Sequence, residues 1–267
     1  MGITGTEVAK QAARMILADD NFATIVAAVR DGRAIFSNIR KFLRYLLSSN
    51  MGEVLTVFLG IVFAGAIGLA VPGAPAALPL LATQILWINL ITDSAPALAM
   101  GIDSEVDDVM ARPPRKSTDR VIDERMWFGV ILLGVVMAIA TLLTLDLYLP
   151  GGFVEGDRDL ANARTAAFTT LVLAQLFNCF NARSEDRSAF ANLFGNTWLW
   201  GAIGLSVVLQ VAVVHIDVLN RAFGTTPLTL DQWLTCTALA SAVLWVSEMR
   251  KLVSRLVRST LRARLAC

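Results

Sequence analysis

The chain has 267 residues, of which 55% are hydrophobic and 17% are charged, and its formal net charge at pH 7 is +1. With a positive mean hydropathy, this composition excludes an ordinary soluble domain and predicts an integral membrane protein whose partner is the lipid bilayer. The net charge says little about other partners, because in a membrane protein the side on which charges lie matters more than their sum, and we expect no nucleic acid partner.

The N-terminal residues contain no targeting signal that would be removed. Residues 1–20 lack the successive basic, apolar and small-residue regions of a signal peptide, so we expect insertion to depend on the membrane spans themselves. After Asp20, apolar residues recur at helical spacing as far as Arg44. This spacing predicts a helix that runs directly into the membrane.

Six stretches approach the roughly 20 apolar residues that a helix needs to cross a bilayer core about 30 Å thick. Turn-rich segments separate them, and Gln175, Asn178 and Asn181 make the fourth stretch the weakest. The sequence therefore predicts an all-α membrane protein, a six-transmembrane-helix bundle. Its spans are expected at residues 42–70, 79–100, 127–149, 165–182, 198–216 and 231–249.

Basic residues predict the orientation of these spans. They gather before the first span, between the second and third, after the fourth and in the tail. The opposite loops hold only Arg158, Arg164 and Arg221. By the positive-inside rule, both termini are expected in the cytoplasm. The chain then divides into an N-terminal segment (1–41), a six-span domain (42–249) and a basic cytoplasmic tail (250–267).

The three cysteines and the single histidine of the chain indicate no metal site and no disulfide. Cys179, Cys236 and Cys267 lie far apart and form no C-x-x-C motif, so we expect neither a zinc site nor a disulfide framework. His215 falls at the end of an apolar stretch, and we assign it no role.

Polar residues inside the first two spans are the strongest functional signal. Asn50 and Glu53 are three residues apart, and Asn89, Thr92 and Asp93 follow an i, i+3, i+4 pattern, so each set shares one helical face. A carboxylate near the middle of a span costs on the order of 3 kcal/mol. Such residues normally face a cavity or the bundle interior and serve a function.

The types of these residues indicate a site for a hard cation. Carboxylate, amide and hydroxyl oxygens are the ligands that calcium prefers, and Gln175 could add a neutral oxygen. Pro96 cannot donate to the carbonyl of Thr92, so we expect that carbonyl to be a further ligand. The alternative is that these polar residues only make interhelical hydrogen bonds. The candidate metal ligands are Asn50, Glu53, Asn89, Thr92, Asp93 and Gln175.

Four successive segments resemble type II P-type ATPases, most closely the calcium pumps of the endoplasmic reticulum type and their bacterial relatives. They are GTEVAKQAARMILADDNFATIVAAVRDGR, RYLLSSNMGEV, LLATQILWINLITDSAPALAMG and VDDVMARPPR. The resemblance implies that the six stretches are spans five to ten of such a pump. It also implies that Asn50, Glu53, Asn89, Thr92 and Asp93 bind the transported ion. The calcium pumps have a glutamate where this sequence has Gln175, so one negative charge is lost from one ion site.

Several motifs of the family are absent from this sequence. It has no DKTGT motif, which carries the phosphorylated aspartate, no GDGxNDxP motif, which holds magnesium, and no PEGL segment. The resemblance therefore implies that residues 1–41 are the end of a phosphorylation domain and a cytoplasmic stalk helix. We expect no ATP hydrolysis by this chain alone and no cofactor of its own. ATP and magnesium would act only in a complete pump, whose N-terminal half would be a partner if the pump is split.

The segment at residues 102–120 resembles the cytoplasmic loop that touches the phosphorylation domain in this family. Within it, Asp107 and Asp108 are interpreted as a solvated acidic turn.

Three functions remain open at this point. The first is the transport part of a cation-pumping ATPase, with calcium as the expected cation and a bacterial plasma membrane as the expected location. The second is a non-enzymatic cation-binding or regulatory membrane protein with the same fold. The third, an independent transporter or channel, is disfavoured because no internal repeat is visible. Oxygen ligands alone do not distinguish calcium from manganese or sodium.

Overall fold

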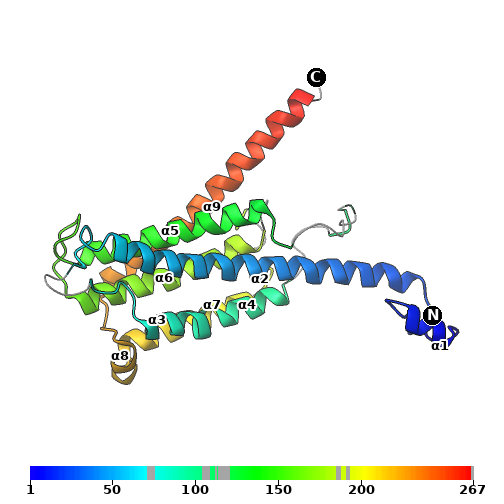
Figure 1. Ribbon diagram of the computed structural model, residues 1–267, viewed down its shortest axis with the longest axis horizontal. Coiled ribbons are helices and arrows are strands. Elements are labelled where there is room, and N and C mark those ends of the chain that lie inside the picture. Colours follow the sequence, from blue (N-terminus) through cyan, green and yellow to red (C-terminus); the bar gives the residue numbers. More distant parts are fainter. Residues whose placement is uncertain are drawn as a thin grey trace.

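The computed structural model describes residues 1–70, 76–103, 109–111, 113, 121–184, 188–190 and 193–265. Every regular element within these residues is a helix (Figure 1), which confirms the all-α class. Asp107, Asp108 and Cys267 lie outside the described residues. The elements are α1 (Glu7–Ala12), α2 (Ala23–Val62), α3 (Ala82–Trp87), the π-helix η1 (Ile88–Thr92), α4 (Ser94–Gly101), α5 (Glu124–Tyr148), α6 (Leu160–Ala182), α7 (Thr197–His215), α8 (Asp217–Phe223) and α9 (Leu230–Leu265).

In the described part of the chain, three helices are long and apolar enough to cross a membrane, namely α2, α5 and α7. The predicted helix that enters the membrane without interruption is present as the 40-residue α2. The first apolar stretch was expected to be helical as far as residue 70, but α2 ends at Val62. Turns follow it, and Gly68 has a φ of 73° that a right-handed helix does not allow. The number of six spans stays a prediction.

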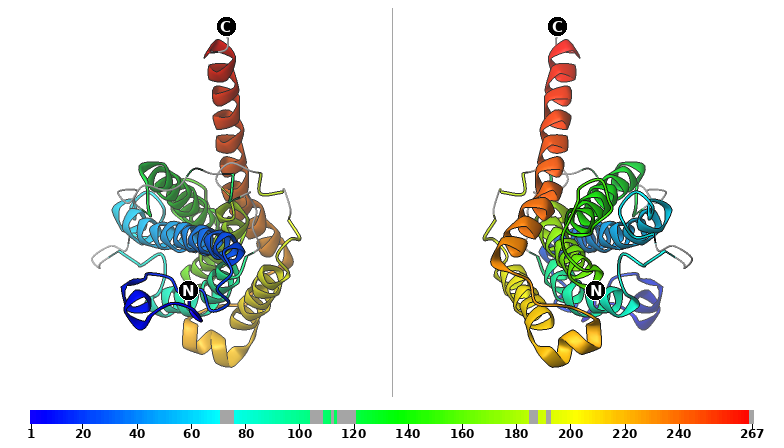
Figure 2. Two further views of the ribbon diagram at one scale, coloured as in Figure 1. Left: turned by 90° about the vertical axis from the view of Figure 1, so that its right-hand side faces the viewer. Right: turned by 90° about the vertical axis from the view of Figure 1, so that its left-hand side faces the viewer.

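Helix α6 lies at the centre of the bundle. It packs against α2, α5, α7 and α9, and Figure 2, which looks along the bundle, shows it surrounded by other helices. Between Ala163 and Ala182 nearly every side chain of α6 is buried. Because α6 is surrounded by protein, it can carry polar side chains, and it lacks the strongly apolar stretch found in each of α2, α5 and α7.

Small residues bring α2 and α5 close together. A Cβ atom on Gly52 would lie 3.0 Å from the Cβ of Met137, and a Cβ on Gly134 would lie 2.6 Å from the Cγ of Met51. Glycine allows such close approach of helices within membranes. The contact also fixes the position of Glu53, which follows Gly52 directly.

Asp146, near the end of α5, holds the loop that follows this helix. Its carboxylate accepts hydrogen bonds from the backbone nitrogens of Phe153 and Val154, at 2.9 and 3.1 Å. A Cβ on Gly152 would lie 1.9 Å from Asp146 Oδ1, so this loop requires glycine there. Asp146 therefore has a structural partner in the loop, away from the candidate ligands.

A single carboxylate fastens the first residues of the chain. Asp20 accepts hydrogen bonds from the backbone nitrogens of Gly2, Ile3 and Thr4 and from the hydroxyl of Thr4. The Thr4 hydroxyl, followed by these backbone groups, lowers the pKa of Asp20 to about 2. The ionised form is therefore the one that holds this segment.

We expect Asp20→Ala to release the N-terminal segment at pH 7, seen as faster hydrogen exchange of the Gly2, Ile3 and Thr4 amides. Because folding depresses the pKa of Asp20 from its ordinary value of 3.8 to about 2, the parent chain should lose the same protection as pH falls through this range. Asp31→Ala, on an exposed position of α2, is the control. Unchanged exchange in Asp20→Ala would contradict the prediction.

Candidate cation site

The helical segment that carries three of the six candidate ligands is interrupted. Between α3 and α4, η1 forms a π-helical turn in which the backbone nitrogen of Asp93 donates to the carbonyl of Ile88, five residues back, at 3.0 Å. Short π-helical segments occur frequently at functional sites. This one contains Asn89 and Thr92 and is followed directly by Asp93, so the irregular backbone coincides with the predicted ligands.

Glu53 joins three parts of the bundle. Its Oε2 accepts from Asn89 Nδ2 on η1 at 2.5 Å, and its Oε1 accepts from Gln175 Nε2 on α6 at 3.0 Å. The side chain is 4% exposed. A buried carboxylate is costly unless it is paired, hydrogen-bonded or bound to a metal. The structure thus brings three of the predicted ligands, from α2, η1 and α6, into direct contact.

Asp93, the residue that follows η1, is 1% exposed. Its Oδ1 accepts a hydrogen bond from the hydroxyl of Tyr45 on α2 at 2.7 Å. Its Oδ2 is buried and has no hydrogen-bond partner. One oxygen of this carboxylate is therefore fixed by a hydrogen bond within the protein, and the other is not.

Tyr45 was not predicted from the sequence, although a signal for it exists. It belongs to a buried stripe of small and polar residues on α2 with helical spacing, and such stripes mark helix contacts within membranes. The members of this stripe are Tyr45, Ser48, Ser49, Gly52, Glu53, Thr56 and Gly60.

Two amides on α6 resemble Asp93, because one polar atom of each side chain is hydrogen-bonded within the protein and the other has no partner. Gln175 donates to Glu53, and Asn178 donates from Nδ2 to the Ser48 hydroxyl at 2.6 Å. The carbonyl oxygens of both amides are buried without a hydrogen-bond partner. An unpaired buried acceptor is costly. A cation would satisfy oxygens of this kind.

Two further candidates have different surroundings. Asn50 is exposed, and its Nδ2 donates to the carbonyl of Leu46 in its own helix at 2.8 Å. Asn50 lies beside the buried stripe of α2 and not within it. Although Asn50 and Glu53 are three residues apart on the helix, the Asn50 side chain forms no hydrogen bond with the Glu53 carboxylate. Thr92 is buried, and its hydroxyl donates to the carbonyl of Ile88 at 3.0 Å. Ion binding by either residue stays a prediction.

The carbonyl of Thr92 has a partner on a neighbouring helix. Pro96 leaves it without a donor four residues ahead, and Ser206 on α7 donates to it from Oγ at 3.2 Å. Because a carbonyl oxygen has two lone pairs, its role as a further ligand stays a prediction.

The charges of the site are limited to two carboxylates. Among the described residues, there is no group of three or more histidine, cysteine, aspartate and glutamate side chains that could hold a metal ion. Cys179 and Cys236 are buried free thiols. The available ligands are hard oxygens of Glu53, Asp93 and neutral side chains, which suit calcium or a similar cation better than zinc.

Comparison with known proteins shows the family to which the chain belongs. Residues 77–253 match the family described as "Cation transporting ATPase, C-terminus". The chain belongs to this family. The resemblance to the C-terminal membrane part of type II P-type ATPases is therefore confirmed.

Curated relatives of this cation-transporting ATPase C-terminus are named as calcium pumps. The Calcium-transporting ATPase of Bacillus subtilis is 42% identical over 234 residues, which cover 88% of this chain and 25% of that protein. Calcium-transporting ATPase 1 of Bacillus cereus is 39% identical, with 96% of this chain and 29% of that protein covered. The endoplasmic reticulum-type Calcium-transporting ATPase 4 of Arabidopsis thaliana is 33% identical, with 96% and 28% covered. The chain thus spans little more than a quarter of these relatives.

The cation-transporting ATPase C-terminus also contains a buried ion cluster that sequence reasoning missed. Asp103, just beyond α4, pairs with Lys41 Nζ at 2.8 Å and with Arg183 Nη2 at 3.1 Å, and it accepts from Asn196 Nδ2 at 3.0 Å. All four residues are at most 5% exposed. The cluster therefore joins α2 to the ends of α4 and α6 and to the start of α7. Lys41 lies four residues before Tyr45 and continues the helical spacing of the buried stripe of α2. This spacing is the sequence signal that could have predicted the burial of Lys41.

Proposed function

We propose that this chain is the cation-translocating membrane part of an ATP-driven P-type pump, and that the transported cation is calcium. One observation carries the proposal. The carboxylates of Glu53 and Asp93 are buried at the interruption of a membrane helix, beside acceptor oxygens of Asp93 and Gln175 that have no partner in the protein. The names of the curated relatives support calcium as the ion.

The proposed ligands all belong to this chain. Glu53 and Asp93 would supply two negative charges, and Asn50, Asn89, Thr92 and Gln175 would supply neutral oxygens. Two carboxylates balance the charge of one divalent ion. Since Gln175 stands where the calcium pumps have glutamate, we propose that this site holds one calcium ion.

We further propose the arrangement in the membrane that the sequence predicted. Helices α2, α5, α6 and α7, the interrupted α3–η1–α4 segment and the first part of α9 would form six spans. Both termini would then lie in the cytoplasm, with the basic residues near them, and the two Bacillus relatives support a bacterial plasma membrane as the location. A cysteine placed in the 150–159 loop should react with an impermeant thiol reagent added outside intact cells, whereas a cysteine near residue 255 should not.

A chimeric pump tests the function. Residues 1–267 would replace the matching C-terminal quarter of the Bacillus subtilis Calcium-transporting ATPase, and ATP-dependent uptake of radioactive calcium into membrane vesicles would be measured. We expect uptake by the chimera and none by its Glu53→Gln variant. A chimera that forms a phosphoenzyme from inorganic phosphate but takes up no calcium would favour a non-enzymatic cation-binding role for this chain. Manganese and sodium, tested in parallel, address the choice of ion.

We expect Gln175 to affect the calcium affinity of the site without being essential for calcium binding. In the chimera, we expect Gln175→Ala to raise the calcium concentration for half-maximal uptake by less than about tenfold, because a neutral oxygen contributes less than a carboxylate to holding a divalent ion. Gln175→Glu should raise the amount of calcium bound per pump. A larger loss in Gln175→Ala than in Glu53→Gln would place the site elsewhere.

A further inference from the structure

Helix α9 is longer than a membrane crossing requires. It runs without interruption over 36 residues, from Leu230 to Leu265, whereas roughly 20 residues cross the hydrocarbon core of a bilayer. Figure 1 shows that its C-terminal part leaves the bundle obliquely, and Figure 2 shows the same part projecting to one side of the other helices. Part of α9 therefore extends beyond a single membrane crossing.

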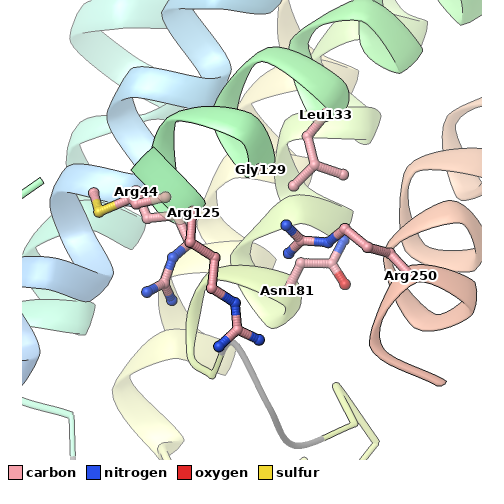
Figure 3. Close-up of a pocket in the computed structure, with 7 residues that line it drawn as sticks. Arg44, Arg125, Gly129, Leu133, Asn181 and Arg250 are labelled. Atoms are coloured by element: carbon pink, nitrogen blue, oxygen red, sulfur yellow. The ribbon is translucent and has the colours of Figure 1, made fainter. Parts of the chain in front are cut away.

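Contacts with α5 and α6 show where α9 leaves the bundle. Figure 3 shows Arg250 reaching from α9 toward Asn181 of α6, and a Cβ on Gly129 of α5 would lie 2.7 Å from Arg250 Nη1. Gly129 lies in the second turn of α5, and Asn181 is one residue from the end of α6. Residue 250 is therefore level with the start of α5 and the end of α6. We have proposed that this end of the bundle faces the cytoplasm.

Tryptophan side chains mark the edge of the membrane at this end of the bundle. Trp127 near the start of α5, Trp198 near the start of α7 and Trp245 on α9 are 42%, 71% and 58% exposed. The ring of Trp245 lies 6.2 Å from that of Phe190, in the connection between α6 and α7. Tryptophan is enriched where a membrane meets water. The residues of α9 that follow Trp245 therefore lie in or beyond this interface.

An apolar stripe continues along α9 from Trp245. Its members are Trp245, Met249, Leu252, Val253, Leu256 and Val257, which are between 53% and 66% exposed. Their i, i+4, i+7, i+8, i+11 and i+12 spacing places them on one face of the helix. Ser247 and Lys251 lie on the opposite face and are buried, at 0% and 2% exposed. The stripe therefore faces away from the bundle.

Cationic residues of this part of α9 lie outside the stripe. Lys251 pairs with Glu248 at 3.5 Å, and Arg255 is exposed. In the sequence, Arg258 and Arg262 continue the helical spacing of Lys251 and Arg255, and no aspartate or glutamate follows Glu248. A helix with an apolar face and a basic face is typical of segments that lie in the plane of a membrane interface.

We propose that residues 249–257 of α9 bind the surface of the cytoplasmic leaflet, with the apolar stripe among the acyl chains and the cationic residues on the headgroup side. The proposal rests on the proposed arrangement of spans, in which α9 crosses the membrane last. The stripe is continuous with Trp245 and begins at the membrane edge, so a lipid surface reaches it directly. A second copy of the chain would instead bring a tail of the same positive charge against this one, which is unfavourable.

Introduced cysteines test the proposal in the full 267-residue chain. Cys267→Ser removes the thiol of the tail, and Cys179 and Cys236 are buried, so a fluorophore can be attached at Val253→Cys, Leu256→Cys or Arg255→Cys in phosphatidylglycerol–phosphatidylcholine nanodiscs. We expect doxyl-labelled lipid to quench the labels at 253 and 256 several-fold more than the label at 255. Iodide in the water should show the reverse order. Equal quenching at all three positions, or stronger iodide quenching at 253 and 256, would overturn the proposal.

Tryptic cleavage after Arg255 tests the same contact without a label. Cleavage requires the tail to leave the membrane surface, so its rate follows the population of the released form. We expect Leu252→Ser/Leu256→Ser to speed this cleavage in nanodiscs by about fivefold or more, because the change removes apolar surface from the stripe. The matched control, Leu252→Met/Leu256→Met, keeps the stripe apolar and should be cleaved at nearly the parent rate. Parent-like cleavage of the serine variant would contradict a lipid contact.

The same nanodiscs separate this inference from its alternatives. If the labels at 253 and 256 are shielded from both quenchers and each nanodisc holds two chains, a second copy covers the stripe and the lipid proposal is wrong. Calcium binding measured in parallel tests the proposed function. Calcium binding that Glu53→Gln abolishes, together with iodide-accessible labels at 253 and 256, overturns only the tail contact. The expected quenching without calcium binding contradicts only the proposed function.

Discussion

Asp93→Asn in the chimeric pump is expected to raise the calcium concentration needed for phosphorylation from ATP by about a hundredfold or more. The change removes one of the two charges that would face the ion at the proposed site, and losing one partner of a buried charged contact costs about 3–5 kcal/mol. Phosphorylation from inorganic phosphate without calcium should persist, because that reaction needs no bound ion in this family. Labelled phosphoenzyme, measured over a range of calcium concentrations, gives both results.

Asp146→Asn is the matched control for this substitution. Asp146 is a buried carboxylate of the same bundle, but it binds loop amides and none of the proposed ligands. We expect its variant to keep the calcium dependence of the parent chimera. Full calcium activation in Asp93→Asn, with the parent-like response in Asp146→Asn, would show that Asp93 is not a ligand.

Asp103→Ala is expected to have the largest effect on stability. It would leave Lys41 and Arg183 buried without their shared carboxylate, and breaking a buried ion pair in this way costs about 3–5 kcal/mol in the free energy of unfolding. Unfolding of the purified chain in mixed detergent, followed by tryptophan fluorescence, measures the loss.

Two comparison variants separate this effect from a general loss of charge. Glu7→Ala breaks the exposed pair with Lys10 and should cost no more than about 0.5 kcal/mol. The triple variant Lys41→Met/Asp103→Leu/Arg183→Met should recover much of the loss, since apolar groups can replace a complete buried ion cluster. Equal stabilities of Asp103→Ala and Glu7→Ala would contradict the account.

The cost of polar groups in a membrane explains which parts of the site the sequence predicted. Glu53, Asn89, Gln175 and Asp93 stand out within apolar stretches, and the structure places the first three in direct contact. Asn50 also stands out, but it lies at the exposed side of α2. Helical spacing identifies the face of a helix only to within about one residue. This precision is not sufficient to distinguish residues in the buried stripe from a residue at its edge, such as Asn50.

Other features depend on contacts between distant parts of the chain and could not be predicted locally. Pro96 indicates a carbonyl without its helical donor, but only the packed bundle shows that Ser206 supplies another. Asp103 lies beside a loop, where a charged residue is normally solvated, and its burial results from the meeting of four helices. The end of α2 at Val62 was missed because apolar residues continue after the backbone has turned.

Equilibrium binding of radioactive calcium to the purified 267-residue chain in lipid nanodiscs tests the central claim most directly, because every proposed ligand lies within this chain. We expect about one calcium ion per chain at saturation, in line with two carboxylates at one oxygen-rich site. The Glu53→Gln and Asp93→Asn variants should each lose this binding, and Asp146→Asn should retain it. Equal calcium binding by the parent, Glu53→Gln and Asp93→Asn, or no binding by the folded parent chain, would contradict the assignment of this site.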